Sequence, residues 1–402
     1  MNLTAAAAGV TFKGRPAIEN VAQELRRQSA ARLDSVADTE DVRFMVAEDQ
    51  FCVQVPGIDG LLTINEHAHS QLAEYVGLPK SSRLYKRLRA GQSDDVSQLW
   101  QTWADLYNAV FEKQPKRKLF RTMVDRSGER YLRAFLSDRY QILDNDSIFH
   151  AAFEAGNDAG AVPWHARLSD SNFYLYLVSE TLTAEIDRHM DGAARGDHKF
   201  YERQNGGGGG EVHHAACMIR NSEVGAGRIE IRPAIVNSVC SNYLVLDIAI
   251  SKIHLGGKIE ENDLLTAGTI RKKNELFFDE LRDIVSGVFD PERFQKYIDS
   301  IHGATRDPVE NPVEAANALQ VVYGVSEERR DAILSNFAKG GDTSRYGLIS
   351  AITLEAHSND SVVPEVGVEL ETLGAALLGT TMGDVMDKYD KAAEKEEATA
   401  TA

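Results

Sequence analysis

Two long β-hairpins place the strongest constraint on how this chain can fold. The first covers residues 119–140, where the runs LFRTMVD and RYLRAFLSDRY flank the polar turn RSGE. The second covers residues 213–240, with its turn around Val224 to Gly227. Strand-prone residues on both sides of a short glycine-containing turn are typical of antiparallel hairpins. The sequence therefore predicts an α+β fold built on a central antiparallel β-hairpin sheet with helices.

Helical periodicity dominates on both sides of these hairpins. Residues 94–112 repeat apolar side chains every three or four positions, which predicts an amphipathic helix. A rougher helical period covers residues 16–37, and two β-prone runs within residues 43–57 predict a short hairpin. A helical C-terminal region follows, with candidate helices near residues 262–288, 291–302, 312–323, 326–338, 343–358 and 365–379.

These patterns divide the chain into four parts, and the basic break KQPKRK at residues 113–118 marks the first boundary. Residues 1–112 form a mixed region with a helical hairpin, and residues 113–258 form a central α+β domain with both long hairpins. Residues 259–383 form the helical C-terminal region. Residues 384–402 are an acidic tail that we expect to be disordered, because such composition buries little apolar surface.

Composition limits the classes of partner. The net charge of the 402 residues is -17, so any contact with nucleic acid must use local basic patches. Three cysteines argue against a disulfide framework. The N-terminus lacks the pattern of a signal peptide, and no apolar run is long enough to span a bilayer. We therefore expect a protein of the bacterial host cytoplasm with no membrane partner.

Two basic stretches stand out against this acidic background. Residues 75–93 contain five Lys or Arg and no acid, and residues 113–140 contain nine against three acids. Aromatic residues interleave in the second stretch, a pattern typical of phosphate contact combined with base stacking. Solvated faces over core aromatics would give the same pattern. The candidate nucleic-acid-binding residues are Arg83, Lys86, Arg87, Arg117, Lys118, Arg121, Arg130, Tyr131, Arg133, Arg139 and Tyr140.

Residues 71–88 resemble a helix-turn-helix, with Gly77 in the turn and Leu78 packed inward. The second helix would begin near Ser81 and present Arg83, Lys86 and Arg87. Pro79 just after the turn departs from this pattern, and the next apolar residue, Leu84, comes about one position late. A plain helical hairpin explains the same residues.

The turn of the second hairpin, residues 221–233, is polar and contains Gly225 and Gly227. Glycines at such positions permit positive φ or a bulge. Two interpretations stay open here. The segment is either a structural hairpin tip or a binding turn that uses exposed Asn221, Glu223 and Arg228.

Signals for metals, cofactors and catalysis are weak. The glycine tract 206–210 lacks the Lys-Ser/Thr of a phosphate-binding loop, which favours a flexible loop. No closed zinc site matches the spacing of the candidate ligands His189, His198, His213, His214, Cys217 and Cys240. No catalytic signature is present, so the sequence indicates neither a cofactor nor catalytic residues. An enzyme would instead require a pocket that gathers His165, Glu180, His214 or Glu223.

Several segments carry a family resemblance. They are QLAEYVGLP, YLRAFLSDRYQILDN, IRNSEVGAGRIEIRPAIVNSVCSN, SKIHLGGK, SRYGLISAITLEAH and an ELETLGAALL-type end. In this order they resemble the phage and plasmid-like proteins grouped as domain of unknown function 932, over roughly residues 60–380. Tyr243 departs from the expected glycine. The resemblance implies a mobile-element protein of uncertain biochemistry, and the paired hairpins are loosely similar to those of phage single-strand annealing proteins.

The first functional hypothesis is a non-enzymatic nucleic-acid-binding protein that prefers single-stranded DNA and acts in phage or plasmid replication or recombination. The second is an acidic accessory protein that binds a protein partner as an inhibitor or DNA mimic. The third is an enzyme without a recognisable motif. Assembly of the chain into a homo-oligomer is compatible with each of them.

Overall fold

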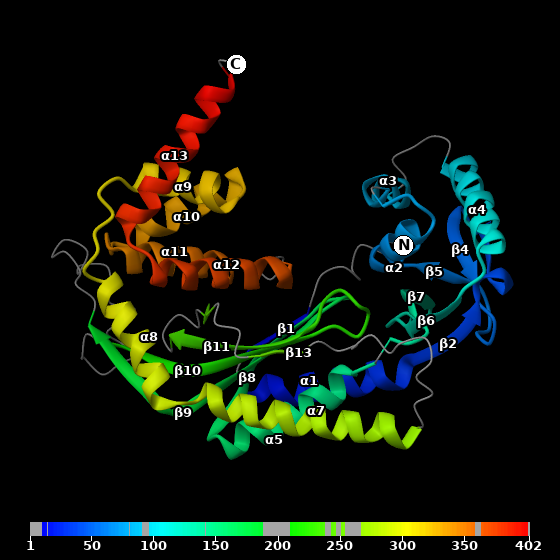
Figure 1. The fold of residues 1–402 in the computed structure, drawn as a ribbon, viewed down its shortest axis with the longest axis horizontal. Helices are drawn as coiled ribbons and strands as arrows, with labels where there is room; N and C mark the ends of the chain where they lie inside the picture. The colour runs from blue at the N-terminus through cyan, green and yellow to red at the C-terminus, as the bar shows by residue number, and fades with distance from the viewer. Residues whose placement is uncertain are drawn as a thin grey trace.

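The computed structural model describes residues 10–13, 15–79, 81–90, 96–140, 142–187, 210–237, 243–246, 251–253, 267–357 and 363–400. These residues form two β-sheets with helices packed against both (Figure 1). The expected α+β class and the helical C-terminal region are therefore confirmed. The two long hairpins, however, belong to different sheets rather than to one central sheet.

The smaller sheet lies in one continuous stretch, residues 32–137, which we call the inserted lobe. Its strand order is β2-β6-β7-β5-β4-β3, and all neighbours are antiparallel except β5 and β7. Its elements are β2 (Arg32–Asp38), β3 (Arg43–Ala47), β4 (Gln50–Gln54), β5 (Leu62–Ile64), α2 (Glu66–Tyr75), α3 (Ser82–Arg89), α4 (Val96–Lys113), β6 (Arg117–Val124) and β7 (Arg130–Ser137).

The remaining described residues form the main lobe, whose sheet has the order β1-β8-β9-β10-β11-β12, with β13 also paired to β11. Its strands are β1 (Val10–Lys13), β8 (Ala161–Leu168), β9 (Phe173–Asp187), β10 (Gly210–Asn221), β11 (Ile229–Asn237), β12 (Tyr243–Val245) and β13 (Ser251–Ile253). Because β1 pairs with β8, the inserted lobe interrupts this sheet in the chain.

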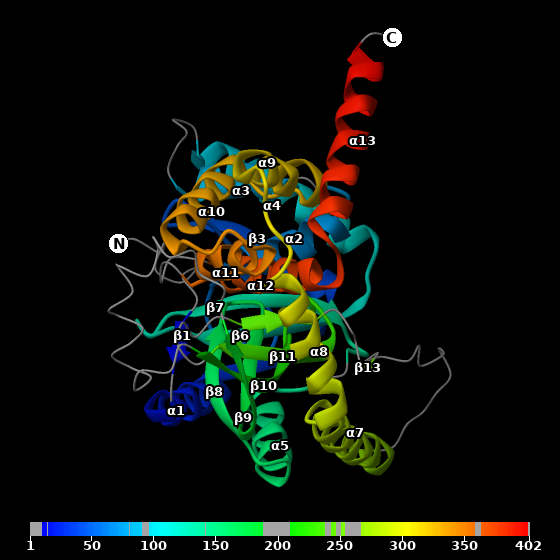
Figure 2. The same cartoon turned by 90° about the vertical axis from the view of Figure 1, so that its left-hand side faces the viewer.

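Helices cover both faces of the main sheet. Figure 1 shows α1, α5 and α7 along one face and α11 and α12 across the other, with α9 and α10 beyond α11 and α12, farther from the sheet. In both views α13 extends away from this helical layer (Figure 1, Figure 2). The bounds are α1 (Arg15–Ala31), α5 (Asn145–Asp158), α7 (Ala267–Val288), α8 (Pro291–Ala304), α9 (Pro312–Tyr323), α10 (Glu327–Gly340), α11 (Arg345–Glu355), α12 (Pro364–Ala376) and α13 (Met382–Ala400).

The inserted lobe has its own aromatic core between α4 and the sheet. Trp100, Trp103 and Tyr107 are buried on one face of α4, as the apolar repeat predicts. They pack against Phe51, whose ring is stacked on Trp100 at 5.7 Å. Aromatic burial of this extent stabilises a lobe of about 100 residues as an independent core.

Three boundaries differ from expectation. The helix predicted over residues 16–37 ends at Ala31, because residues 32–38 pair with β6 as strand β2 and expose Leu33 and Val36. The first long hairpin, β6 and β7, belongs to the same sheet as the strands of residues 32–112 and not to the sheet of the second hairpin. The expected disordered tail begins as helix α13, because Val385 is buried and Tyr389 packs against the main core.

Candidate nucleic-acid interface

The tip of the second hairpin is held between the two lobes by Arg121. This side chain, on β6, is fully buried. Its guanidinium donates to the backbone oxygen of Glu223 at 2.6 Å, to Asp34 Oδ2 at 3.0 Å and to Asp144 Oδ1 at 3.3 Å. A buried guanidinium with three acceptors is a structural group. The expectation that Arg121 holds a phosphate is therefore wrong for this structure.

Arg133 is likewise buried and bonded within the protein. It is 4% exposed, and its Nη1 donates to Glu223 Oε2 at 2.9 Å. The other carboxylate oxygen of Glu223 accepts from the backbone N–H of Asn145 at 2.7 Å. Burial opposes ionisation of Glu223, but Arg133 and Arg121 outweigh it and hold the pKa of this carboxyl below its ordinary value. Arg133 is thus removed from the phosphate contacts as well.

Residues 221–227, which we call the hairpin tip, make further bonds across the lobe boundary. His67 and Gln71 on α2 both donate to the backbone oxygen of Val224, at 2.9 and 2.8 Å. The Asn221 amide donates to the backbone oxygen of Leu143 at 2.9 Å. Asn221 and Glu223 are buried, so neither is exposed for an external partner, and this segment is a structural hairpin tip.

Four other candidates are committed to contacts within the protein. Arg130 is half-buried and donates to Thr122 Oγ1 at 3.0 Å. Tyr140 donates to the backbone oxygen of Ser222 at 2.9 Å, and Arg228 donates to Glu230 at 3.3 Å. Tyr131 is half-buried, and burial raises its pKa to about 12. Neither tyrosine presents the open ring that base stacking requires.

The cations of α3 stay at the surface. Arg83 and Arg87 are exposed, and Lys86 is exposed but forms an ion pair with Glu66 at 2.7 Å. Helix α3 has only eight residues, and Tyr85 and Leu88 face inward while Leu84 is 42% exposed. The residue that packs inward is therefore Tyr85, one position after Leu84, so the apolar position of this helix comes even later than the helix-turn-helix pattern requires.

A second exposed group lies where α4 leads into β6. Arg117 and Lys116 are exposed, and Arg139 is exposed just beyond the end of β7. The ammonium groups of Lys116 and Lys118 lie 5.8 and 5.2 Å from the centre of the Tyr75 ring. We call Lys116, Lys118 and Tyr75 the paired-lysine site.

The electrostatics of the paired-lysine site are those of two like charges held together. Burial and the neighbouring Lys116 lower the pKa of Lys118, and Asp138 opposes them more weakly. Neither lysine forms an ion pair with a carboxylate of the described residues. Two ammonium groups without a bonded acid are suited to hold an anion such as phosphate through charge-assisted hydrogen bonds.

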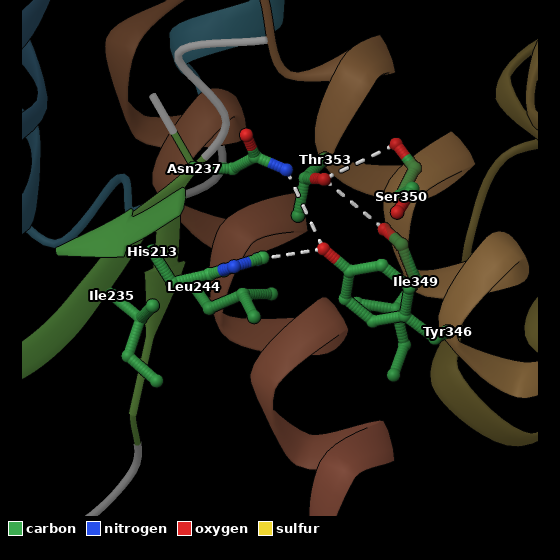
Figure 3. A pocket seen from close by; sticks show the side chains of 8 residues that line it. All are labelled: His213, Ile235, Asn237, Leu244, Tyr346, Ile349, Ser350 and Thr353. Atoms are coloured by element: carbon green, nitrogen blue, oxygen red, sulfur yellow. Dashed lines mark hydrogen bonds between the residues drawn. The ribbon is translucent and has the colours of Figure 1, made fainter. Parts of the chain in front are cut away.

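A small pocket lies between the main sheet and α11 (Figure 3). Tyr346 Oη is 2.7 Å from His213 Nε2 and 3.1 Å from Glu211 Oε2. The hydroxyl carries one proton and can donate to only one of these groups. Both hydrogen bonds form when His213 Nε2 carries a proton and donates to the hydroxyl, which in turn donates to Glu211. The lining residues are His213, Ile235, Asn237, Leu244, Tyr346, Ile349, Ser350 and Thr353.

A further buried polar cluster joins α12 to the sheet. Glu371 is fully buried, accepts from Arg167 Nη2 at 2.7 Å and from the Tyr176 hydroxyl at 2.5 Å, and lies 3.0 Å from His357 Nε2. Burial opposes ionisation of Glu371, but Arg167 and His357 keep the pKa of this carboxyl below its ordinary value. The sequence analysis did not single out Arg167 or Glu371, since a lone charged residue within an apolar run identifies no partner.

Three of the four groups that an enzyme would have gathered make separate contacts. His165 packs by Tyr176 and Tyr243, and His214 contacts the backbone oxygen of Ser179 at 2.9 Å. Glu223 belongs to the hairpin tip. Neither of the buried polar groups described above collects two of the four residues named for this hypothesis.

Among the described residues, no three His, Cys, Asp or Glu side chains are placed to share a metal ion. His189, His198, Cys240 and residues 206–209 of the glycine tract lie outside the described ranges. None of the described helices combines the length and apolarity needed to cross a membrane. No family model, no curated protein and no solved structure matches the chain.

Proposed function

We propose that this protein binds nucleic acid without catalysis and does so through the inserted lobe. The observation that carries the proposal is the paired-lysine site. Two ammonium groups lie over one ring, where burial lowers the pKa of Lys118 most and repulsion from Lys116 lowers it further. A bound phosphate would relieve this repulsion.

The distribution of charge along the chain supports the same lobe. Residues 32–137 contain 15 Lys or Arg and 15 Asp or Glu, whereas residues 138–402 contain 25 and 44. The net negative charge of the protein therefore arises after residue 137. The negatively charged main lobe repels a polyanion, and the electrostatic repulsion is weakest at the inserted lobe, where the charges balance.

The biological setting follows from the sequence resemblance rather than from these contacts. A protein similar to the phage and plasmid-like group, with single-stranded DNA as its favoured ligand, would serve replication or recombination of a mobile element. The cytoplasm of a bacterial host is the corresponding location.

The test is binding of the full chain to a fluorescent single-stranded oligonucleotide over a series of salt concentrations. We expect affinity to fall steeply with salt, because phosphate contacts release counterions. The variant Lys116→Glu/Lys118→Glu should weaken binding by at least about tenfold, since it converts two phosphate contacts to repulsive ones. The charge-matched control is Lys296→Glu/Lys339→Glu, two exposed lysines of the main lobe.

Equal losses in the two double variants would show that only net charge matters and would overturn the assignment to the inserted lobe. Absence of binding at low salt would overturn nucleic-acid binding altogether. In that case the acidic residues after 137 would favour the alternative, a protein partner with a basic surface.

A further inference from the structure

We infer that the paired-lysine site reads the phosphodiester backbone and leaves the bases unread, so that it binds single strands and duplexes through the same contacts. The inference rests on the proposed function and specifies which part of the nucleic acid the site takes. A preference for single strands would then have to come from contacts outside the paired-lysine site.

Tyr75 supplies the aromatic ring of the site. Two ammonium groups lie over this ring, and its edge-to-face neighbours are Phe111 and Phe135, at 5.3 Å each. The Tyr75 hydroxyl donates to the backbone oxygen of Gln114 at 2.7 Å. A base would have to displace a lysine to reach this ring, whereas a phosphate would bind to the lysines as they stand.

The aromatic residues nearby are equally committed. Phe135 is 5% exposed and lies under Lys118, whose ammonium is 5.2 Å from its ring centre. The sequence predicts that Tyr131 and Tyr140 stack on bases, but both side chains are half-buried. The described part of the inserted lobe therefore offers cations without a stacking platform, and cations alone recognise phosphates irrespective of base or strand number.

The geometry of the lysines is also better suited to binding one phosphate group than to contacting the edges of several bases. Both ammonium groups lie within 6 Å of the same ring centre, so both cations attract an anion that binds beside this ring. The backbone of Lys116 is fixed by two hydrogen bonds with Thr39, which donates its N–H at 3.1 Å and accepts at its hydroxyl at 3.0 Å. A fixed backbone limits the reach of the side chain toward base edges in a groove.

The test compares three fluorescent ligands of equal length with the full chain at one salt concentration. They are an ordinary single strand, a strand whose nucleotides are all abasic, and a duplex. We expect the ordinary and abasic strands to bind within about threefold of each other, because each presents the same phosphates. Removing the lysines with Lys116→Ala/Lys118→Ala should lower the salt slope by about 2 for every ligand.

Binding of the ordinary strand at least about tenfold tighter than the abasic strand would overturn the inference, since base stacking contributes on that scale. That outcome would leave nucleic-acid binding intact. Failure of all three ligands to bind would instead overturn the proposed function, and the backbone inference with it. The control Lys296→Ala/Lys339→Ala should change neither affinity nor slope beyond about twofold.

Discussion

At the scale of single residues, the inserted lobe separates its cations into two environments. Arg121 and Arg133 both donate to Glu223 inside the protein, Arg121 to its backbone oxygen and Arg133 to its carboxylate. Lys116 and Lys118 stay over Tyr75 without a bonded acid among the described residues. The arginines therefore serve the junction between the lobes, and the lysines are the groups that a ligand can reach.

The buried pair predicts a large loss of stability when it is broken. Arg133→Ala leaves the Glu223 carboxylate buried with one fewer cation, and we expect the free energy of unfolding to fall by about 3–5 kcal/mol. Urea denaturation measures this change. Arg126→Ala is the control, because its side chain is 69% exposed and its pairing with Glu24, which Arg27 also contacts, should contribute under about 1 kcal/mol. Similar losses in both variants would contradict a structural role for Arg133.

Asp170, in the turn between β8 and β9, predicts a dependence on pH. Burial, and to a lesser degree Glu66 and Glu365, raises its pKa to about 6 against the opposing Arg133 and Arg89. The folded state therefore binds the proton more tightly than the unfolded state. As pH rises from about 4 to 6, this group destabilises the fold, and above that range the full cost is present.

Asp170→Asn removes this cost. We expect the variant to exceed the parent in free energy of unfolding by roughly 1–2 kcal/mol at pH 7.5, allowing for solvent screening, and to match it near pH 3, below the unfolded pKa. Chemical denaturation at the two pH values measures the difference. A gap of the same size at both would show that the substitution acts through packing rather than ionisation.

The sequence could not place Arg133 on the same side as Arg121 for a specific reason. In this hairpin Arg121 pairs with Ala134 while Thr122 pairs with Leu132, so a bulge in β7 occurs at Arg133. The bulge changes which face of the sheet the residue occupies. If side chains had alternated strictly along both strands, the two arginines would lie on opposite faces of the sheet. No residue pattern in the strand predicts the bulge.

At the scale of elements, patterns with a strong period were predicted well. Helices α4 and α8 to α12 lie within a few residues of their expected ranges, whereas α13 occupies a segment that was expected to be disordered. The second hairpin has Cys217 opposite Pro233, the register expected from a turn near Gly225. Local signals suffice there, because the burial period and the turn residues agree. Strand β2 was missed because its pairing with β6, about 85 residues later, overrides a helical pattern.

The hairpin tip predicts an element-scale effect of Gly225→Ala. Gly225 has φ +76°, and a Cβ there would lie 2.7 Å from Leu136 Cδ2 on β7. Gly128, in the turn between β6 and β7, has φ +93° with open space around it. We expect Gly128→Ala to cost about 1–2 kcal/mol from the backbone alone and Gly225→Ala to cost more, because the tip must also shift. Thermal unfolding that ranks them equally would contradict a tightly seated tip.

At the scale of the whole molecule, two lobes are joined by the chain at Ala31 and Ser137 and by the hairpin tip. The sequence could not reveal this arrangement, because the pairing of β1 with β8 spans the entire inserted lobe and leaves no local trace. The predicted boundary near residue 113 follows a change in composition, which does not mark the edge of a core.

Unfolding of the two lobes should therefore depend on the tip. In proteins that carry Trp164→Phe on β8, the remaining Trp100 and Trp103 report on the inserted lobe, and the α-helical circular dichroism signal reports largely on the main lobe. We expect the two transitions to coincide in the parent and to separate in Glu223→Ala, which removes the bonds from Arg133 and Asn145. Glu129→Ala, at the exposed turn between β6 and β7, is the control and should leave the transitions together. Coincident transitions in Glu223→Ala would show that other contacts couple the lobes.

The position of the inserted lobe within the chain also sets an order of events during synthesis. Val10 finds its partner Leu168 only after the ribosome has made the whole of residues 32–137. The inserted lobe can therefore complete its aromatic core first, and it presents a finished socket before the hairpin tip, residues 221–227, is translated. The frame of the protein is thus assembled around a part that has already folded.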